Sequence, residues 1–292
     1  MAISALTLTV ILGSSLAWAG FDATRKRLTG VLDPMPLVVW LMVGQLVPFG
    51  IWMAVDGAPL PGPDYLAPAA ATVALNVVAN VAFLTAVQKS PLSVTIPLLS
   101  LTPVFSAVVG VVLLGESPTL QQTVGLVAIV LGALGLQAPE GEGPLALLRA
   151  WRREPGAPWM ALVAVLWSAS AVLDKAATAA STESVHGFVL CAGIALSLLV
   201  WLGARKRLGE LKAIRRAPGL WVAATACGTA ALALQLVAFQ WTLVSLVEAI
   251  KRAVGMTMAL VIGRLAFDER IPPRRIVAVG VMIVGGALLV GA

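Results

Sequence analysis

Three ionisable residues lie close together in one apolar segment near the end of the chain. Glu248, Lys251 and Arg252 follow one another at spacings of three and four residues, which places them on one face of a helix. If the segment crosses a membrane, each ionisable side chain costs about 2.5–3.5 kcal/mol and marks a functional site by default. Lys251 and Arg252 suit a carboxylate or phosphate of a substrate, and Glu248 suits a counter-ion or a proton carrier. The alternative is a structural triad with partners such as Asp22 or Asp174.

Polar side chains also recur in two other apolar runs. Thr72, Asn76 and Asn80 stand four residues apart, so on a helix they form a stripe that faces protein or a cavity. Asparagine amides both donate and accept hydrogen bonds, which suits a polar substrate. Hydrogen bonding between helices explains the stripe equally well. Gln235 occupies a similar position in another run and carries the same two interpretations.

The segment Leu92–Leu114 combines hydroxyl side chains with two prolines. Pro97 and Pro103 each remove a helix hydrogen bond and clash with the preceding turn. They predict a kinked or broken helix, which exposes backbone carbonyls to a substrate or bends as a gate. Ser100 and Thr102 lie between or beside the prolines and are therefore candidate substrate-binding residues.

Trp18 and Trp167 stand in the middle of apolar segments, away from the membrane interface where tryptophan is usual. One interpretation is that they line a cavity and stack on a ligand. The other is that they pack against neighbouring helices. The sequence leaves both open.

Charged residues near the ends of two segments suggest gates. Asp22 with Arg25 and Lys26, and Asp174 with Lys175, are predicted at opposite faces of the membrane. Each set is a candidate salt bridge that closes one side of a substrate path. The alternative is a set of helix-end charges in solvent, where such pairs contribute little.

Other chemistry finds little support. The two cysteines, Cys191 and Cys227, lie in apolar runs as small packing residues, and His186 is expected to be an incidental surface residue. One histidine and two distant cysteines do not form a conventional zinc site, so we expect no metal. No nucleophile–base pair, phosphate-cradling glycine loop or ATP-binding motif is recognisable. We therefore expect no cofactor and no enzymatic activity.

The elements that must position these residues follow from composition. Of 292 residues, 59% are hydrophobic and only 12% charged, whereas soluble domains average roughly a quarter charged residues. Repeated apolar runs of about 20 residues predict an all-α polytopic membrane protein with ten transmembrane helices. The ten segments are Ile3–Phe21, Met35–Val55, Leu66–Val87, Leu92–Leu114, Leu120–Gln137, Pro158–Leu173, Gly187–Gly203, Gly219–Trp241, Val244–Phe267 and Ile276–Val290.

The basic residues predict the orientation. All but Lys175, Lys251 and Arg252 of the 20 basic residues fall on one side of the ten-segment arrangement. The positive-inside rule places that side in the cytoplasm and both termini outside, in a bacterial-type inner (plasma) membrane. The net charge of +6 therefore reports topology rather than a nucleic-acid partner.

The two halves of the sequence resemble each other. Residues 16–26 line up with residues 165–175, and Trp18 matches Trp167. An acidic pair or Gly-Glu pair, the latter ending at Glu116, precedes the last segment of each half. Each half has five segments, and because five is odd, the second copy enters the membrane upside down. Inverted repeats around a midplane site are a recurrent plan of secondary transporters. The expected units are a first repeat at 1–137, a basic cytoplasmic linker at 138–157 and a second repeat at 158–292.

Two five-span halves, a tryptophan in the first span of each and an acidic turn before the last span together resemble the EamA-type transporters of the drug/metabolite transporter superfamily. The resemblance implies a carrier whose path is lined mainly by spans 3, 4, 8 and 9 and by spans 1, 2, 6 and 7, with spans 5 and 10 peripheral. Members handle amino acids, nucleotide sugars, amines, drugs and lipid-linked sugars, so the substrate does not carry over. Many members have cytoplasmic termini, and this sequence departs from that pattern.

The leading functional hypothesis is an alternating-access secondary transporter of a small polar or anionic metabolite, and we expect an exporter. The second is a flippase for a lipid-linked anionic headgroup, because a cationic site between helices also suits a phosphate near the membrane. An enzyme or a purely structural protein is disfavoured. The coupling ion, the direction of transport and the choice between monomer and homodimer stay open.

Overall fold

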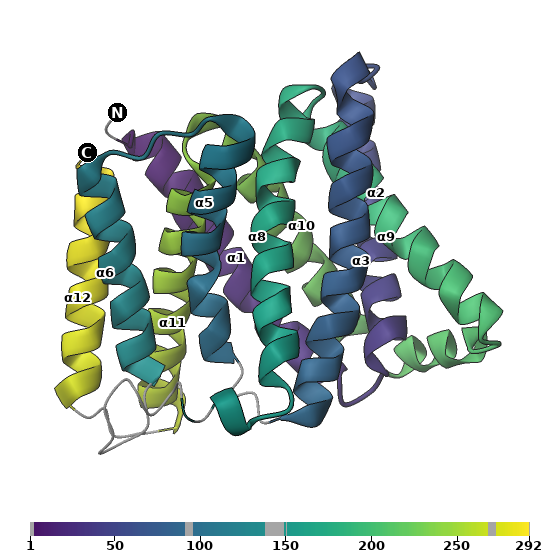
Figure 1. Cartoon of the computed structure of the whole chain (residues 1–292). Coiled ribbons are helices and arrows are strands. Elements are labelled where there is room, and N and C mark those ends of the chain that lie inside the picture. Colours follow the sequence, from purple (N-terminus) through teal and green to yellow (C-terminus); the bar gives the residue numbers. More distant parts are fainter. Residues whose placement is uncertain (1–2, 91–95, 138–148, 150, 268–272, 292) are drawn as a thin grey trace.

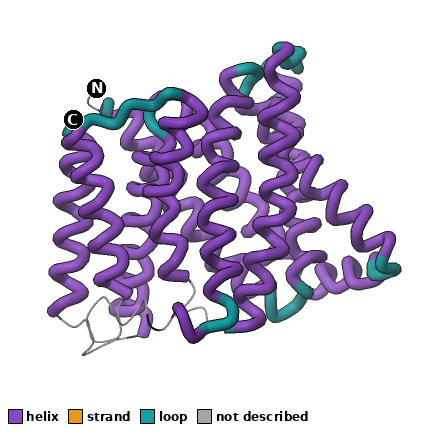
Figure 2. The backbone as a smooth tube through the Cα atoms, viewed as in Figure 1, coloured by secondary structure: helices purple, strands orange, loops and turns teal. Residues whose placement is uncertain are grey.

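The computed structural model describes residues 3–90, 96–137, 149, 151–267 and 273–291, and these residues are helical almost throughout (Figures 1 and 2). Among the candidate site residues, the side chains of Lys26 and Pro97 lie outside the described part. The helices are α1 (Ala5–Leu28), α2 (Pro34–Val55), η1 (Pro63–Tyr65), α3 (Leu66–Lys89), η2 (Ile96–Leu101), α5 (Thr102–Leu114), α6 (Leu120–Gln137), α8 (Ala157–Ala179), α9 (Glu183–Ala204), η3 (Leu208–Arg216), α10 (Pro218–Trp241), α11 (Val244–Phe267) and α12 (Pro273–Val290).

The prediction of an α-helical membrane protein is confirmed in its coarse form. Within the described residues, seven helices are long and apolar enough to cross a membrane: α1, α2, α3, α8, α9, α10 and α12. Helices α5 and α6 are shorter apolar helices. Helix α11 is 24 residues long and carries the charged triad Glu248, Lys251 and Arg252. The arrangement of ten spans in two inverted repeats stays a prediction.

Proline positions explain where many of the helices begin. Pro34, Pro103, Pro158, Pro218 and Pro273 each occupy the first turn of their helix. Proline is favoured there because its fixed φ suits a helix and its missing N–H would have no partner in the first turn. The proline and glycine punctuation of the sequence therefore fixes the boundaries between apolar helices.

Helices from the two halves of the chain pack against each other in pairs. Extensive contacts join α1 to α10, α3 to α8, α2 to α9 and α6 to α12, and α5 and α11 contact each other as well as α8 and α1, respectively. Between α6 and α12 the backbones approach closely, because a Cβ added to Gly125 would lie 2.7 Å from the carbonyl oxygen of Gly285. Small residues allow such contacts between apolar helices. Figure 1 shows α6 and α12 side by side at one edge of the molecule.

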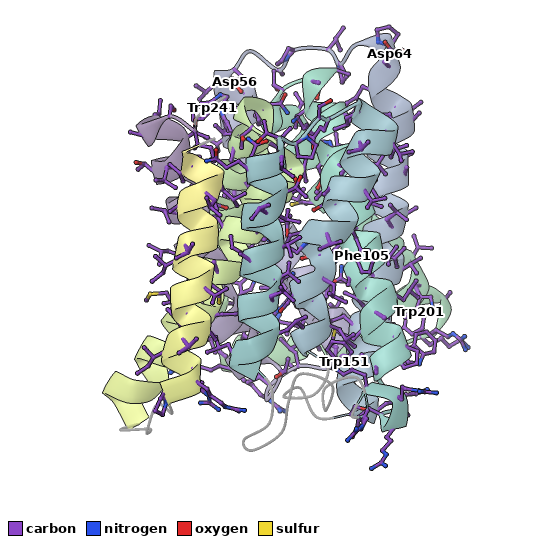
Figure 3. The ribbon with its side chains drawn as sticks, turned by 60° about the vertical axis from the view of Figure 1, so that its left-hand side comes forward. Asp56, Asp64, Phe105, Trp151, Trp201 and Trp241 are labelled. Atoms are coloured by element: carbon purple, nitrogen blue, oxygen red, sulfur yellow. The ribbon has the colours of Figure 1, made fainter. Side chains whose placement is uncertain are left out.

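The two ends of the helical bundle differ in charge. Both chain termini lie at one end in Figure 1, and Figure 3 places Asp56, Asp64 and Trp241 at this end, which we call the termini side. Trp201 lies toward the other end, where the chain continues into η3. The residues that follow α9 and those of η3 include many of the basic side chains, so we call this end the basic side.

On the basic side, Arg207 is bound to two acidic partners. Its Nε lies 2.5 Å from Glu210 Oε1, and its Nη2 lies 3.2 Å from Asp33 Oδ2. The hydrogen bond with Glu210 raises the pKa of Arg207 above its ordinary value. The guanidinium therefore keeps its positive charge at every physiological pH. The positive-inside rule depends on residues that stay charged in this way.

Candidate functional site

Lys251 contacts three other predicted site residues. Its ammonium donates a hydrogen bond to Glu248 one turn earlier in α11 and another to Gln235 Oε1 of α10 at 2.9 Å. It also lies over the ring of Trp18 of α1, 5.3 Å from the centroid. Glu248 is only 4% exposed. Three helices therefore meet at one buried, charged position, which we call the Lys251 cluster.

The Lys251 cluster lies deep in the bundle. Helix α11 begins at Val244 on the termini side, directly after Trp241 in the chain. Lys251 is seven residues further on, which at 1.5 Å per residue corresponds to about 10 Å along the helix axis. Trp18 stands in the middle of α1. Of the charged residues toward the ends of the bundle, Asp22 of α1 is close enough to interact electrostatically with Lys251.

Arg252 connects α11 to the first half of the chain. Its Nε donates to Thr102 Oγ1 at 3.2 Å, and Thr102 is 1% exposed. The Thr102 hydroxyl in turn donates to the carbonyl of Leu99 at 2.8 Å. The two cations of α11 thus have different partners, because Lys251 binds α10 and α1 whereas Arg252 binds the start of α5.

The helix that starts at Thr102 is broken, as the prolines predict. Residues Ile96–Leu101 form the 3₁₀ helix η2, and α5 begins at Thr102 with Pro103 in its first turn. Thr102 is thus the first α-helical residue after the change of helix type. Ser100 is buried at 1% exposure in η2. The predicted break is confirmed, and its use as a gate stays a prediction.

Trp167 has a different environment from Trp18. Its ring lies 5.6 Å from that of Phe83 in α3. Both rings pack against a buried apolar cluster that includes Leu98 and Leu99 of η2. The described contacts of Trp167 are therefore packing contacts, which was one of the two interpretations of its position.

The polar stripe of α3 bonds to α8. Asn76 Nδ2 donates to Ser170 Oγ at 2.6 Å, and Asn80 Nδ2 donates to the carbonyl of Asn76 at 2.7 Å. Thr72 Oγ1 lies 2.7 Å from Ser170 Oγ. Hydrogen bonding between helices therefore accounts for Asn76, and Asn80 bonds within its own helix. Contact of either residue with a substrate stays a prediction.

On the termini side, Lys175 pairs with a residue that sequence reasoning did not select. Its ammonium lies 2.7 Å from Glu116 Oε1 and donates to the carbonyl of Thr242 at 2.9 Å. The same Glu116 oxygen accepts the backbone N–H of Val244 at 3.3 Å. This arrangement ties α8, the end of α5 and the start of α11 together at this end of the bundle.

Asp174, the neighbour of Lys175, has other partners. Asp174 Oδ1 lies 3.1 Å from His186 Nε2 of α9 and accepts from Thr72 Oγ1 at 2.6 Å. The predicted Asp174–Lys175 pair is therefore wrong, because successive residues of a helix point in different directions. The prediction of a surface histidine is also wrong, since His186 is fully buried.

The charged pair at the other end of α1 is solvent-exposed. Arg25 Nη2 lies 2.8 Å from Asp22 Oδ1, and the Asp22 side chain is 57% exposed. The Arg25 guanidinium also lies 5.2 Å from the ring centroid of Phe83. The predicted Asp22–Arg25 pair is confirmed, whereas its role as a gate stays a prediction.

Comparisons with known proteins support the assignment suggested by the sequence. Residues 5–137 match the EamA-like transporter family. The resemblance to the EamA-type transporters is confirmed. A solved crystal structure superposes on 98% of this chain and 96% of its own, with a TM-score of 0.72 at 17% sequence identity, which shows a shared fold. No curated protein matches the chain significantly.

The match over residues 5–137 suggests a membrane transporter of the drug/metabolite type. Sequence reasoning missed the roles of Glu116 and His186 because each stands at the end of an apolar segment, where a charge is ordinarily solvated. Glu116 carried a usable signal, since an acidic residue recurs before the last segment of both halves. Within the described residues, no group of three or more His, Cys, Asp or Glu side chains is placed to hold a metal ion.

Proposed function

We propose that this chain is an alternating-access carrier of a small polar or anionic metabolite, and that an anionic group of the substrate binds at Lys251 and Arg252. The observation that carries the proposal is the Lys251 cluster, in which Lys251, Glu248, Gln235 and Trp18 converge from three helices. Charged groups in a membrane protein interior mark substrate paths and ion paths.

The charge balance of this region favours an anion. Lys251 and Arg252 carry two positive charges, and Glu248 neutralises one of them. A buried charge is stabilised only when it is paired and hydrogen-bonded. A carboxylate or phosphate beside Arg252 supplies the missing negative charge and matches the planar guanidinium in a bidentate arrangement. The ring of Trp18 offers an apolar face to the remainder of such a substrate.

The packing of the helices supports two inverted repeats, residues 1–137 and 158–292. If the two halves are exchanged, α1 takes the place of α8 and α10 takes the place of α3. The α1–α10 contact then becomes the α8–α3 contact, and both contacts are present. The same exchange returns the pairs α2–α9, α5–α11 and α6–α12 to themselves. This pairing is the one expected of a two-fold relation between the halves. Carriers of this type alternate access by rocking one repeat against the other around a central site.

The distribution of charge supports an orientation with the basic side in the cytoplasm and the termini outside. In this orientation, the Lys175–Glu116 contact lies toward the outer face. We expect export rather than import, which transport assays in both directions will decide. A flippase differs in its ligand, because it recognises a phosphate that belongs to a lipid.

A thermal-shift assay of the purified protein tests the proposal. The probes are L-glutamate, inorganic phosphate and AMP as anions, choline as a cation and glycerol 3-phosphate as a phospholipid headgroup. We expect at least one free anion to raise Tm and choline to leave it unchanged. Stabilisation by glycerol 3-phosphate alone favours the flippase instead. If no anion raises Tm, the cationic site does not bind substrate.

A matched pair of variants locates the binding site. Arg252→Gln removes one partly buried cation and keeps a hydrogen-bond donor for Thr102. We expect it to weaken anion binding about tenfold, which corresponds to about 1.4 kcal/mol. The control is Lys212→Gln, which removes an exposed cation from η3. If both variants respond to the anion like the wild type, the binding site lies elsewhere.

A further inference from the structure

The buried histidine on the termini side forms a chain of hydrogen bonds that the substrate site does not use. His186 is the single histidine of the sequence and is fully buried. Its Nε2 lies 3.1 Å from Asp174 Oδ1, and its Nδ1 lies 3.3 Å from the Tyr65 hydroxyl. The three residues come from α9, α8 and η1, so the imidazole lies where three elements meet.

The contacts determine which nitrogen can accept a proton. An ionised carboxylate only accepts hydrogen bonds, so Nε2 carries a hydrogen that points at Asp174. Nδ1 is then the basic nitrogen of the neutral ring. The Tyr65 hydroxyl donates to the bare Nδ1, and after rotation about its C–O bond it accepts from a protonated Nδ1. The site can therefore bind one proton without moving a heavy atom.

The surrounding charges favour that proton. Among the described residues, the other buried or partly buried charged groups of this layer are Asp174, Glu116, Lys175 and Glu183, which stands one turn before His186 in α9. They sum to two negative charges, so a protonated His186 lowers the net negative charge of the layer to one. The exposed carboxylate of Asp56, at the end of α2, accepts a hydrogen bond from Ser184 in the same turn of α9. The remaining titratable groups that face Asp174 are Tyr65 of η1 and the Cys191 thiol of α9, which are neutral acids. A buried carboxylate without a compensating cation is strongly disfavoured.

Hydroxyl and amide groups extend the chain toward the middle of α3. The hydrogen of Thr72 Oγ1 points at Asp174, so Ser170 must donate to Thr72. Asn76 in turn donates to Ser170. All three donors are thus oriented toward the carboxylate of Asp174. The charge on Asp174 therefore determines that Asn76 donates to Ser170, Ser170 to Thr72 and Thr72 to Asp174.

We propose that His186 is the proton-binding residue of the carrier, with Asp174 as its positioning residue, so that the coupling ion is a proton. This inference rests on the proposed function, because a coupling ion has meaning only in a carrier. Binding forms one N–H bond at Nδ1 with a proton taken from water, and release returns that proton to water. Proton binding favours the closed termini side because it lowers the net negative charge of the buried layer, and proton loss raises that charge again, which favours contact with water.

The single histidine allows a direct test. The full-length protein, purified with a tag free of histidine and labelled with nitrogen-15 at histidine, gives one imidazole to titrate by NMR. We expect one imidazole titration in the wild type and a midpoint that differs by at least about one pH unit in Asp174→Asn, since a charge partner shifts a pKa by this order. The control Asp22→Asn removes an exposed carboxylate at the other end and leaves the midpoint unchanged.

Tyr65→Phe provides a second variant if Asp174→Asn does not fold. It removes the acceptor of the protonated Nδ1, so the midpoint falls by a smaller amount, because an unpaired donor on a charged ring is costlier than an unpaired lone pair. The proposal is overturned if His186 does not titrate between about pH 5 and 9, or if its midpoint is the same in the wild type and in the folded variants.

A second measurement separates proton coupling from anion binding. The Tm increase caused by L-glutamate, inorganic phosphate or AMP is measured at about pH 6 and about pH 8, on either side of a typical histidine titration. We expect at least a twofold difference between the two pH values in the wild type and none in His186→Gln. Equal increases at both pH values overturn the coupling and leave the anion site intact. If no anion acts at either pH, the substrate proposal fails, and the NMR titration alone decides the proton site.

Discussion

Trp18 and Trp167 stand at matching positions of the two halves, and both pack on apolar residues and on a phenylalanine ring, but their described contacts with cations differ. The ring of Trp18 faces the ammonium of Lys251, which also binds Gln235. The ring of Trp167 faces Phe83 and packs on the apolar residues of η2. The two tryptophans match in sequence position, whereas a cation contacts the ring in the first half and the described contacts of the ring in the second half are apolar.

The different partners of Trp18 and Trp167 indicate that the proposed substrate site is asymmetric although the two halves are similar. Cationic groups come from α11 of the second half, and the corresponding helix of the first half is broken by prolines and contributes hydroxyl groups. A ligand that lies between them would meet cations on one side and hydroxyl groups on the other. This arrangement suits the polar or anionic metabolite proposed above.

The largest expected effect comes from removing the cation beside Trp18. Lys251→Met leaves Glu248 buried without its partner, and breaking a buried pair in this way costs about 3–5 kcal/mol. We expect a large fall in Tm and a loss of anion binding. The double variant Glu248→Gln with Lys251→Met removes both charges, so it should recover most of the stability and none of the binding. Recovery of binding in the double variant would show that the Lys251 cluster is purely structural.

Local features of the molecule and contacts between its two halves differ in how far the sequence could predict them. The pairing of Lys251 with Glu248 follows from a spacing of three residues on one helix, and the broken helix follows from Pro97 and Pro103. The apolar segments likewise follow from composition and proline punctuation. Local rules of this kind act within a few residues of the chain and therefore appear directly in the sequence.

Contacts between the halves were much less predictable. Gln235 and Trp18 reach Lys251 only because α1, α10 and α11 pack together. From the sequence, Glu116 and His186 are expected to be solvated residues at helix ends, yet both are buried. Glu116 contacts Lys175, which lies more than fifty residues away in sequence, and His186 contacts Asp174 of the preceding helix. Long-range packing decides whether a charge at a helix end faces water or protein, and a single sequence carries little of that information.

A smaller effect is expected from changing the ring next to the cation. Trp18→Phe keeps an aromatic ring but weakens the cation–π contact with Lys251, which contributes about 0.5–2 kcal/mol. We expect the affinity for the stabilising anion to fall a few-fold, as measured by titration calorimetry, with a minor change in Tm. An unchanged affinity would show that Trp18 only packs, like its counterpart in the second half.

The smallest effect on binding is expected at that counterpart. Trp167→Phe preserves the aromatic pair with Phe83 and loses part of its packing area, so it costs up to about 1.5 kcal/mol of stability. Its affinity for the anion should stay within about twofold of the wild type, because Trp167 has no described contact with the cations of α11. The two tryptophan variants thus form a matched pair, because Trp18 contacts a cation and Trp167 makes packing contacts. If Trp167→Phe weakened binding as much as Trp18→Phe, both rings would line the path, and the substrate would have to contact the two halves equally.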